Sequence, residues 1–187
     1  MNQFTEGMLI DLAVRNDDHF AFGELVKRNQ SSVRHSLRQL SNWNESLADD
    51  LAQETFIQAY KGLHRFNQKS KFSSWLYRIA YNQFLQHCRT GKAQKNYAEF
   101  EDIDDHEIQA IEHTTASEKP SDQLHEQLAQ LMAQLEPERR SVLHLLLHRQ
   151  CTQQEIATIM VIPLGTVKTH ITRGRAFLQQ KLASWQD

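Results

Sequence analysis

The chain has 187 residues, of which 40% are apolar and 24% charged, with a formal net charge of −2 at pH 7. This length allows one domain or two small ones. No stretch approaches the ~18 apolar residues of a membrane span, and the N-terminus lacks the pattern of a signal peptide, so we expect a cytoplasmic protein without membrane insertion. Cys88 and Cys151 fit no metal-ligand spacing and the ten histidines are scattered, so no metal and no cofactor is predicted.

Charge is distributed unevenly along the chain. Between Thr55 and Ala98 there are eight basic residues and no acidic one, whereas residues 91–121 hold three basic and eight acidic residues. Such segregation is typical of surfaces that bind a polyanion, here with an acidic tether beside them. Solvated helix faces with randomly clustered charges would give the same pattern, so charge alone leaves both interpretations open.

Helical periodicity dominates the first ninety residues. Apolar residues at helical spacing predict a helix from about residue 21, with a break near Asn29. The next helix is expected to start at Ser46, which has the spacing of a capping box. A polar loop over residues 67–71 precedes a further helix that begins near Phe72 and whose pattern fades after Arg89.

A linker is predicted over residues 91–121, which contain few large apolar side chains. Such a segment cannot bury enough surface to offset the entropy lost on ordering. Helical periodicity resumes at Leu124. The predicted fold class is therefore all-α, with two small helical domains at residues 1–90 and 122–187 joined by a flexible acidic linker.

The most informative pattern lies near the C-terminus. Thr152 and Glu155 have the spacing of a capping box, and Pro163 and Gly165 interrupt the short helix that the box starts. The helix predicted after Gly165 carries only basic charges as far as Lys181. A short helix, a tight turn and a longer basic helix predict a helix-turn-helix whose second helix enters the DNA major groove. The alternative is an ordinary helical hairpin with an exposed cationic face.

Two segments resemble parts of small bacterial sigma factors. The C-terminal segment, with EIATIM and GTVKTH, is similar to region 4, although a response-regulator output domain has comparable features. DDLAQETFIQAYKGLHRF resembles region 2.2, and FNQKSKFSSWLYRIAYNQFLQHCR resembles the promoter-melting and recognition segments that follow it. This pair, joined by a linker without region 3, is typical of the extracytoplasmic-function (ECF) group. One departure is Gln150, where the family usually has a left-handed glycine; the replacement costs about 1 kcal/mol.

The resemblance implies a non-enzymatic initiation factor with three sets of functional residues. Those expected to dock on core RNA polymerase are Asp49, Asp50, Gln53, Glu54 and Phe56. Those expected to recognise and melt the minus-ten element are Asn67, Lys69, Ser70, Lys71, Phe72, Arg78 and Asn82. Those expected to read the minus-thirty-five element are Lys168, Thr169, Thr172 and Arg173.

Promoter opening also needs aromatic surfaces on which unstacked bases can stack. Phe72, Trp75 and Tyr81 are candidates, although Trp75 and Tyr77 fall in a dense apolar helix and fit a core role better. The partners implied are core RNA polymerase and promoter DNA, and an anti-sigma factor is a further candidate.

Three other functions compete with this interpretation. A helix-turn-helix regulator that acts without polymerase explains the C-terminal pattern but not the cationic, aromatic segment beside DDLAQETF. An enzyme would need a nucleophile elbow, a phosphate loop or a metal motif, and none is present in the sequence. An all-helical adaptor predicts no salt-sensitive DNA binding.

Overall fold

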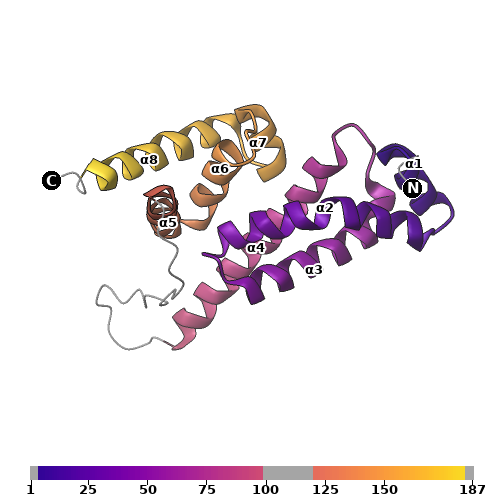
Figure 1. Cartoon of the computed structure of the whole chain (residues 1–187), viewed down its shortest axis with the longest axis horizontal. Helices are drawn as coiled ribbons and strands as arrows, with labels where there is room; N and C mark the ends of the chain where they lie inside the picture. The colour runs from indigo at the N-terminus through magenta and orange to yellow at the C-terminus, as the bar shows by residue number, and fades with distance from the viewer. Residues whose placement is uncertain (1–3, 99–119, 184–187) are drawn as a thin grey trace.

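The computed structural model describes residues 4–98 and 120–183, and side chains over residues 4–91 and 127–183. All regular elements within these residues are helical, which confirms the predicted fold class. Figure 1 shows them in two groups that follow each other along the chain. The first group comprises α1 (Glu6–Arg15), α2 (His19–Leu40), α3 (Glu45–Gly62), the 3₁₀ turn η1 (Leu63–Arg65) and α4 (Phe72–Ala98). The second comprises α5 (Pro120–Ala133), α6 (Pro137–Leu147), α7 (Gln153–Met160) and α8 (Leu164–Ala183).

The core of the first group lies between three long helices. Helix α3 packs against both α2 and α4, and α1 packs across α2 at one end (Figure 1). Each helix contributes an apolar stripe, represented by Leu37 in α2, Ala59 in α3 and Leu76 in α4, all less than 2% exposed. This packing leaves one side of α2 and α3 and the polar side of α4 on the surface.

Several helix boundaries differ from the sequence prediction. The predicted break near Asn29 is wrong: α2 continues because the Asn29 side chain donates to the Leu25 carbonyl at 2.8 Å within the helix. Helix α3 is capped by Asn44, whose side chain accepts from the Leu47 amide at 3.0 Å, so Ser46 is not its N-cap. Helix α4 extends beyond the predicted end at Arg89.

Helix α1 was not predicted at all. Its N-cap, Thr5, accepts from the Met8 amide, and Leu9, Ile10 and Ala13 are buried. Most of the predicted linker, residues 99–119, lies outside the described residues, so the division into domains and a linker stays a prediction. No helix within the described ranges is long and apolar enough to cross a membrane.

The second group has the predicted helix-turn-helix. Thr152 and Glu155 form both hydrogen bonds of a capping box at the start of α7. The turn depends on Val161, which is left-handed with φ 56°, and not on Gly165, which lies inside α8. Gln150 is also left-handed, with φ 52°, so the conformation that usually selects glycine is present with a side chain in place.

The close crossing of α8 over α6 depends on a missing side chain. A Cβ added at Gly174 would lie 2.6 Å from Leu143 Cδ1, closer than packed carbon atoms approach. Val167, Ile171 and Leu178 continue the buried stripe of α8 on either side of this point. Gly174 therefore sets the distance at which α8 packs on α6.

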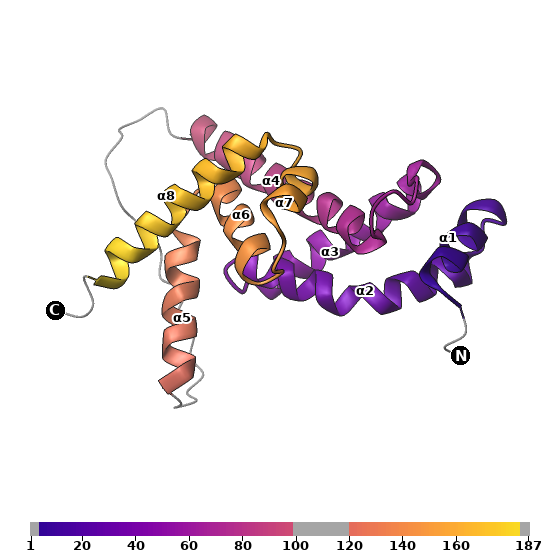
Figure 2. The ribbon, with the colours of Figure 1, turned by 90° about the horizontal axis from the view of Figure 1, so that it is seen from above.

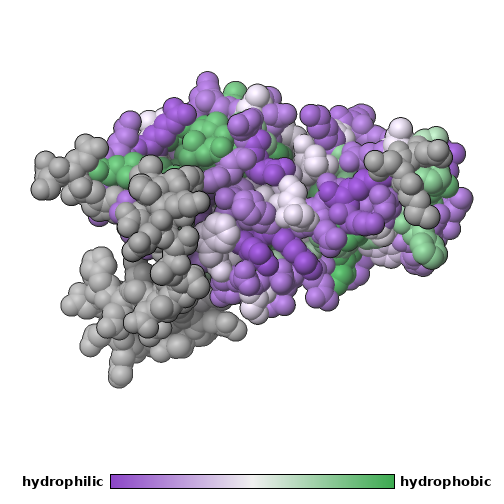
Figure 3. All heavy atoms as spheres, in the orientation of Figure 1, coloured by the Kyte–Doolittle hydropathy of each residue, from purple (hydrophilic) through white to green (hydrophobic). Residues whose placement is uncertain are grey.

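The two groups of helices share a continuous apolar core. Helices α6 and α7 lie beside α4, and α6 also lies beside α2, as both ribbon views show (Figures 1 and 2). Val142 and Leu145 of α6 and Ile156 of α7 are fully buried in the same cluster as Leu37 and Tyr81. The surface in Figure 3 is mostly hydrophilic, with apolar atoms gathered along α8 and near α1.

Candidate functional sites

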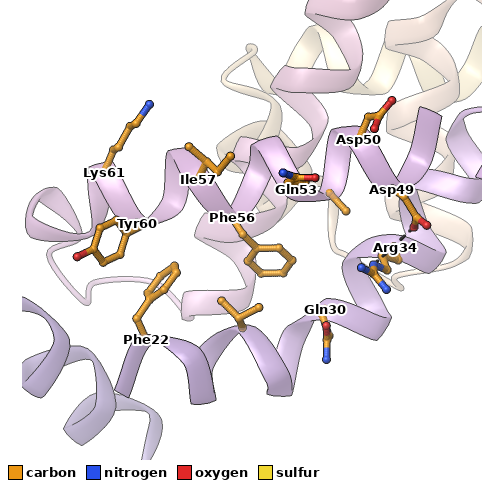
Figure 4. A pocket seen from close by; sticks show the side chains of 12 residues that line it. Phe22, Gln30, Arg34, Asp49, Asp50, Gln53, Phe56, Ile57, Tyr60 and Lys61 are labelled. Atoms are coloured by element: carbon orange, nitrogen blue, oxygen red, sulfur yellow. Dashed lines mark ion pairs between the residues drawn. The ribbon is translucent and has the colours of Figure 1, made fainter. Parts of the chain in front are cut away.

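A groove of about 580 Å³ runs between α2 and α3. Its floor is apolar: Phe22 of α2 points toward α3, Phe56 of α3 points toward α2, and the Phe22 ring packs edge-on against Tyr60 at 5.0 Å (Figure 4). Asp50 and Lys61 lie on its rim and point outward. An apolar floor with charges of both signs at its edge fits a protein partner better than a nucleic acid.

The predicted polymerase-docking residues occupy this groove with one exception. Asp49, Asp50, Gln53 and Phe56 line it, and Asp49 pairs with Arg34 across its end at 3.5 Å (Figure 4). Glu54 does not line the groove; its carboxylate accepts a hydrogen bond of 2.6 Å from Gln58 on a neighbouring face of α3.

The α2 wall of the groove was missed by sequence reasoning. It is formed by Phe22, Val26, Gln30 and Arg34, which are spaced four residues apart and so lie along one face of the helix. Tyr60 was missed as well; its hydroxyl donates to Asp17 at 2.8 Å, and this hydrogen bond raises the pKa of the tyrosine. The spacing of these four residues in α2 could have indicated a shared surface. Its apolar members, Phe22 and Val26, are of a kind that is usually assigned to the core.

The loop before α4 is fixed at three points. Asn67 accepts from the Lys69 amide at 3.1 Å, and Gln68, left-handed with φ 57°, donates to Asp11 of α1 at 2.9 Å. Behind the loop the rings of Phe66, Phe72 and Trp75 pack with centroid distances of 5.1–5.7 Å. The loop therefore holds a defined shape, while Lys69 and its neighbours Ser70 and Lys71 are exposed.

The exposed side of α4 continues from this loop. Lys71, Arg78 and Asn82 are all exposed and are spaced seven and four residues apart, so they lie on one helix face. Two cations and an amide that can hydrogen-bond a base edge thus lie in a row from the loop along α4. Such a row suits a single nucleic-acid strand, whose phosphates and bases lie side by side.

Two of the aromatic candidates do not present a surface for base stacking. Phe72 is only 2% exposed, because its ring is packed between Phe66 and Trp75, so it fixes the loop from behind. Tyr81 is 1% exposed and points into the core shared with α6. Tyr77 is buried, as predicted, and Trp75 is partly exposed, so Trp75 is the ring that remains for stacking among the four considered.

Helix α8 presents all four residues predicted to read the minus-thirty-five element. Lys168, Thr169, Thr172 and Arg173 are exposed on the side opposite the buried stripe. The Thr169 hydroxyl donates to the Gly165 carbonyl at 3.0 Å, which leaves its oxygen lone pairs and methyl group for outside contacts. The other face of this half of α8 is buried in the core through Val167 and Ile171.

A second cleft of about 450 Å³ separates α4 from the helix-turn-helix. Asn82 and Arg89 of α4 line one side, and Thr166 and His170 of α8 line the other. The structure thus brings Asn82, a residue predicted to bind the minus-ten element, close to the start of the helix predicted to read the minus-thirty-five element. Within the described residues, no group of three or more histidine, cysteine or carboxylate side chains is placed to hold a metal ion.

Comparison with known families identifies both halves of the chain. The family model of Sigma-70 region 2 matches residues 25–94, and that of Sigma-70, region 4 matches residues 125–178. The chain is 33% identical over 182 residues to the ECF RNA polymerase sigma factor SigW of Bacillus subtilis, covering 90% of this chain and 92% of that one. It is 30% identical to the RNA polymerase sigma-H factor of Pseudomonas aeruginosa, covering 97% and 96% of the two chains.

Solved structures show the same fold. CnrH, in complex with the cytosolic domain of CnrY, superposes with a TM-score of 0.65 at 23% identity, covering 96% of this chain and 97% of that one. The sigma factor RpoE in complex with the anti-sigma factor NepR from Bartonella quintana gives the same TM-score at 20% identity, covering 87% and 96%. The match to region 2 supports a sigma factor over a helix-turn-helix regulator that acts without polymerase.

Proposed function

The chain belongs to the ECF sigma factors of RNA polymerase, and from this premise we propose which of its surfaces performs each step of promoter-specific initiation. The division proposed is a region 2 domain at residues 1–90, a linker at 91–121 and a region 4 domain at 122–187. The site of action proposed is the cytoplasm, where core polymerase meets the genome.

The groove between α2 and α3 docks on the coiled coil of the clamp in the largest polymerase subunit. Phe22 and Phe56 supply the apolar contact that a helical partner buries, and Asp49 and Asp50 at the edge set its register through charge. A buried aromatic contact supplies most of the affinity in such interfaces, while rim charges act mainly on specificity and association rate. Glu54 lies beside this contact and contributes less to it.

The loop over residues 67–71 and the exposed side of α4 bind the minus-ten element as a single strand. Lys69, Lys71 and Arg78 neutralise phosphates, and Asn82 hydrogen-bonds a base that has left the duplex. Taking a base out of the stack costs a few kcal/mol, which these contacts offset. Because the loop is held by its own hydrogen bonds and by the aromatic cluster behind it, it does not have to order on binding.

Helix α8 reads the minus-thirty-five element in the major groove. Arg173 and the two threonines contact base edges, and Lys168 contacts a phosphate. The solved relatives CnrH and RpoE are each bound to a protein partner, CnrY and NepR, which supports the proposal that an anti-sigma factor also binds this chain.

The observation that carries this function is the coexistence, in one chain, of a protein-docking groove on α2 and α3 and two separate DNA-binding faces on α4 and α8. The test is transcription from a library of promoter fragments by purified core polymerase, with and without the chain, followed by sequencing of the transcripts. A set of transcripts that depends on the chain and shares two upstream elements is expected. Transcripts that are unchanged by the chain would contradict the proposal.

A further inference from the structure

Helix α1 lies beside the loop that precedes α4 (Figures 1 and 2). It contacts the turn η1, which leads into that loop. The Gln68 side chain of the loop reaches α1 and donates a hydrogen bond of 2.9 Å to Asp11, 57 positions away in the chain. The three proposed binding surfaces include this loop, but none of them includes α1.

The surface of α1 leaves room for the Gln68 amide group. Gly7 lies four residues before Asp11, so the two positions are on the same face of α1. A Cβ added at Gly7 would lie 3.6 Å from the Gln68 side-chain oxygen. The amide group therefore lies against α1 with its nitrogen at Asp11 and its oxygen beside Gly7. A side chain longer than alanine at residue 7 would compete with the amide for this space.

The backbone of Gln68 needs such a contact. It is left-handed, with φ 57°, a conformation that glycine adopts freely and that other residues adopt rarely. A residue with a side chain keeps this conformation only where its surroundings hold it there. The Asn67 side chain accepts from the Lys69 amide at 3.1 Å, and Asp11 holds the Gln68 side chain itself. Without Asp11, the loop is free to adopt other conformations.

The hydrogen bond between Gln68 and Asp11 affects the loop more than it affects the stability of the fold. Both residues are exposed, and a single hydrogen bond at the surface contributes little to the free energy of unfolding. The same small free energy changes the balance between two conformations of a loop several-fold. Helix α1 itself is held on α2 by its buried residues, Leu9, Ile10 and Ala13. Loss of the bond should therefore change the loop and leave the fold intact.

Affinity for DNA does not account for a carboxylate at residue 11. The exposed charged residues of the loop, Lys69 and Lys71, are cationic and suit phosphates. A negative charge beside them lowers the affinity for a phosphate backbone. A carboxylate is, however, a strong hydrogen-bond acceptor, because bonds to a charged group are stronger than those between neutral groups. The chemistry of Asp11 therefore fits the fixing of Gln68 and not the binding of DNA.

From these contacts we propose that Asp11 is a positioning residue for base selection in the minus-ten element, and that it acts by fixing the loop over residues 67–71 through Gln68. The inference rests on the proposed function of that loop. Lys69 and Ser70 follow Gln68 directly, so a change in the Gln68 backbone redirects both side chains. A binding site discriminates between ligands only while its polar groups are held close to the productive geometry. Loss of Asp11 should therefore lower selectivity for the base more than it lowers DNA binding.

The test is open-complex formation by the full-length chain with core polymerase, on promoters that differ by single bases in the minus-ten element. The minus-thirty-five element is kept constant, and selectivity is the ratio of open complex on the preferred base to that on the next best base. Asp11→Ala and Gln68→Ala should each lower this ratio about fivefold, the factor that corresponds to one typical hydrogen bond. The double variant should lose no more than either single variant, because both remove the same contact.

Two control variants separate the hydrogen bond from the charge of Asp11. Asp11→Asn removes the charge but keeps a side-chain oxygen that accepts from Gln68, so it should retain the selectivity of the parent. Glu6→Ala removes another exposed carboxylate of α1 and should leave selectivity unchanged. Thermal unfolding of Asp11→Ala is expected to match that of the parent, which shows that the fold is intact.

Several results would overturn the proposal. Asp11→Ala with the selectivity of the parent would remove the role of Asp11 in base selection. Equal loss in Asp11→Asn would assign the effect to charge, and loss in Gln68→Ala alone would make Gln68 a direct contact to DNA. A parent that forms no open complex at all would contradict the proposed function together with the inference, whereas a selective parent with an equally selective Asp11→Ala variant contradicts the inference alone.

Discussion

The two surfaces that we propose as binding sites, the groove on α2 and α3 and the exposed face of α8, differ in their chemical character. The groove presents Phe22 and Phe56, which are partly buried and pack against the core, and the Phe22 ring also packs against Tyr60 of α3. The face of α8 presents Lys168 and Arg173, which are exposed. A protein partner typically buries an apolar surface, whereas DNA is contacted mainly through hydrogen bonds from polar and basic side chains.

This difference determines which substitutions can weaken binding without lowering the stability of the fold. Residues of the groove floor pack α2 against α3 and, in our proposal, also contact the partner. Their replacement therefore affects both the stability of the fold and the binding. The exposed residues of α8 can be replaced without loss of fold, because Val167, Ile171, Gly174 and Leu178 form its buried stripe.

Loss of the groove's apolar floor should have the largest effect. Phe56→Ala together with Asp50→Ala should weaken binding to core polymerase by about 2–4 kcal/mol, since a central aromatic contact and a rim charge are lost together. Fluorescence anisotropy with labelled chain and purified core measures this, and circular dichroism checks the helical content. The matched control is Glu54→Ala on the same helix, outside the groove. Equal weakening by the control would contradict the groove as the docking surface.

Disturbing the contact between α8 and α6 at Gly174 should have the second largest effect, a loss of fold stability. Gly174→Ala places a Cβ 2.6 Å from Leu143 Cδ1 and should destabilise the fold by about 1–3 kcal/mol, measured by thermal unfolding. Gly165→Ala is the control, because no atom lies within 4 Å of its added Cβ and alanine favours a helix. If both variants melted at the same temperature, Gly174 would not set the helix crossing.

Base reading by α8 should be separable from its affinity for phosphates. Arg173→Ala should relax sequence preference within the minus-thirty-five element by about 1–2 kcal/mol, as expected for a lost base contact. Lys168→Ala should instead lower affinity for all sequences and reduce its dependence on salt. Binding to a panel of single-base promoter variants at two salt concentrations measures both effects. Full sequence preference in Arg173→Ala would remove base reading from that residue.

The smallest effect concerns the helix end before α7. Gln150→Gly should stabilise the fold by up to about 1 kcal/mol, because glycine adopts the left-handed conformation at φ 52° without strain. Chemical denaturation measures the change. Gln154→Gly, inside α7, is the opposite control and should destabilise by about 1 kcal/mol. Stabilisation by both variants, or by neither, would show that backbone conformation at residue 150 does not matter.

The parts of the fold that were predictable from sequence depend on local signals. The helix-turn-helix was predicted because a capping box and a buried stripe act within a few residues of each other. Helix α1 was missed because it is only ten residues long and its burial depends on packing against α2. A helix break was predicted near Asn29 because asparagine side chains often compete with backbone hydrogen bonds. Here the Asn29 side chain instead donates to the Leu25 carbonyl within the helix.

Most residues of the candidate sites were predictable from the sequence, whereas the residues that they contact in the fold were not. Periodicity placed Asp49, Asp50 and Gln53 on one polar face, yet the same face was extended to Glu54, which points elsewhere. The burial of Tyr81 against His144 could not be predicted, because that contact joins residues 63 positions apart. Long-range packing of this kind has no local pattern from which to infer it.

In the division of roles that we propose, α4 melts promoter DNA once α3 has docked the chain on polymerase. Permanganate footprinting of unpaired thymines, on complexes of core polymerase with the chain, tests it most directly. Asn82→Ala should bind core polymerase like the parent but leave the minus-ten thymines unreactive, while Gln86→Ala, exposed one turn further along α4, should melt the promoter normally. Equal reactivity in the parent and Asn82→Ala, at equal occupancy of polymerase, would contradict the account.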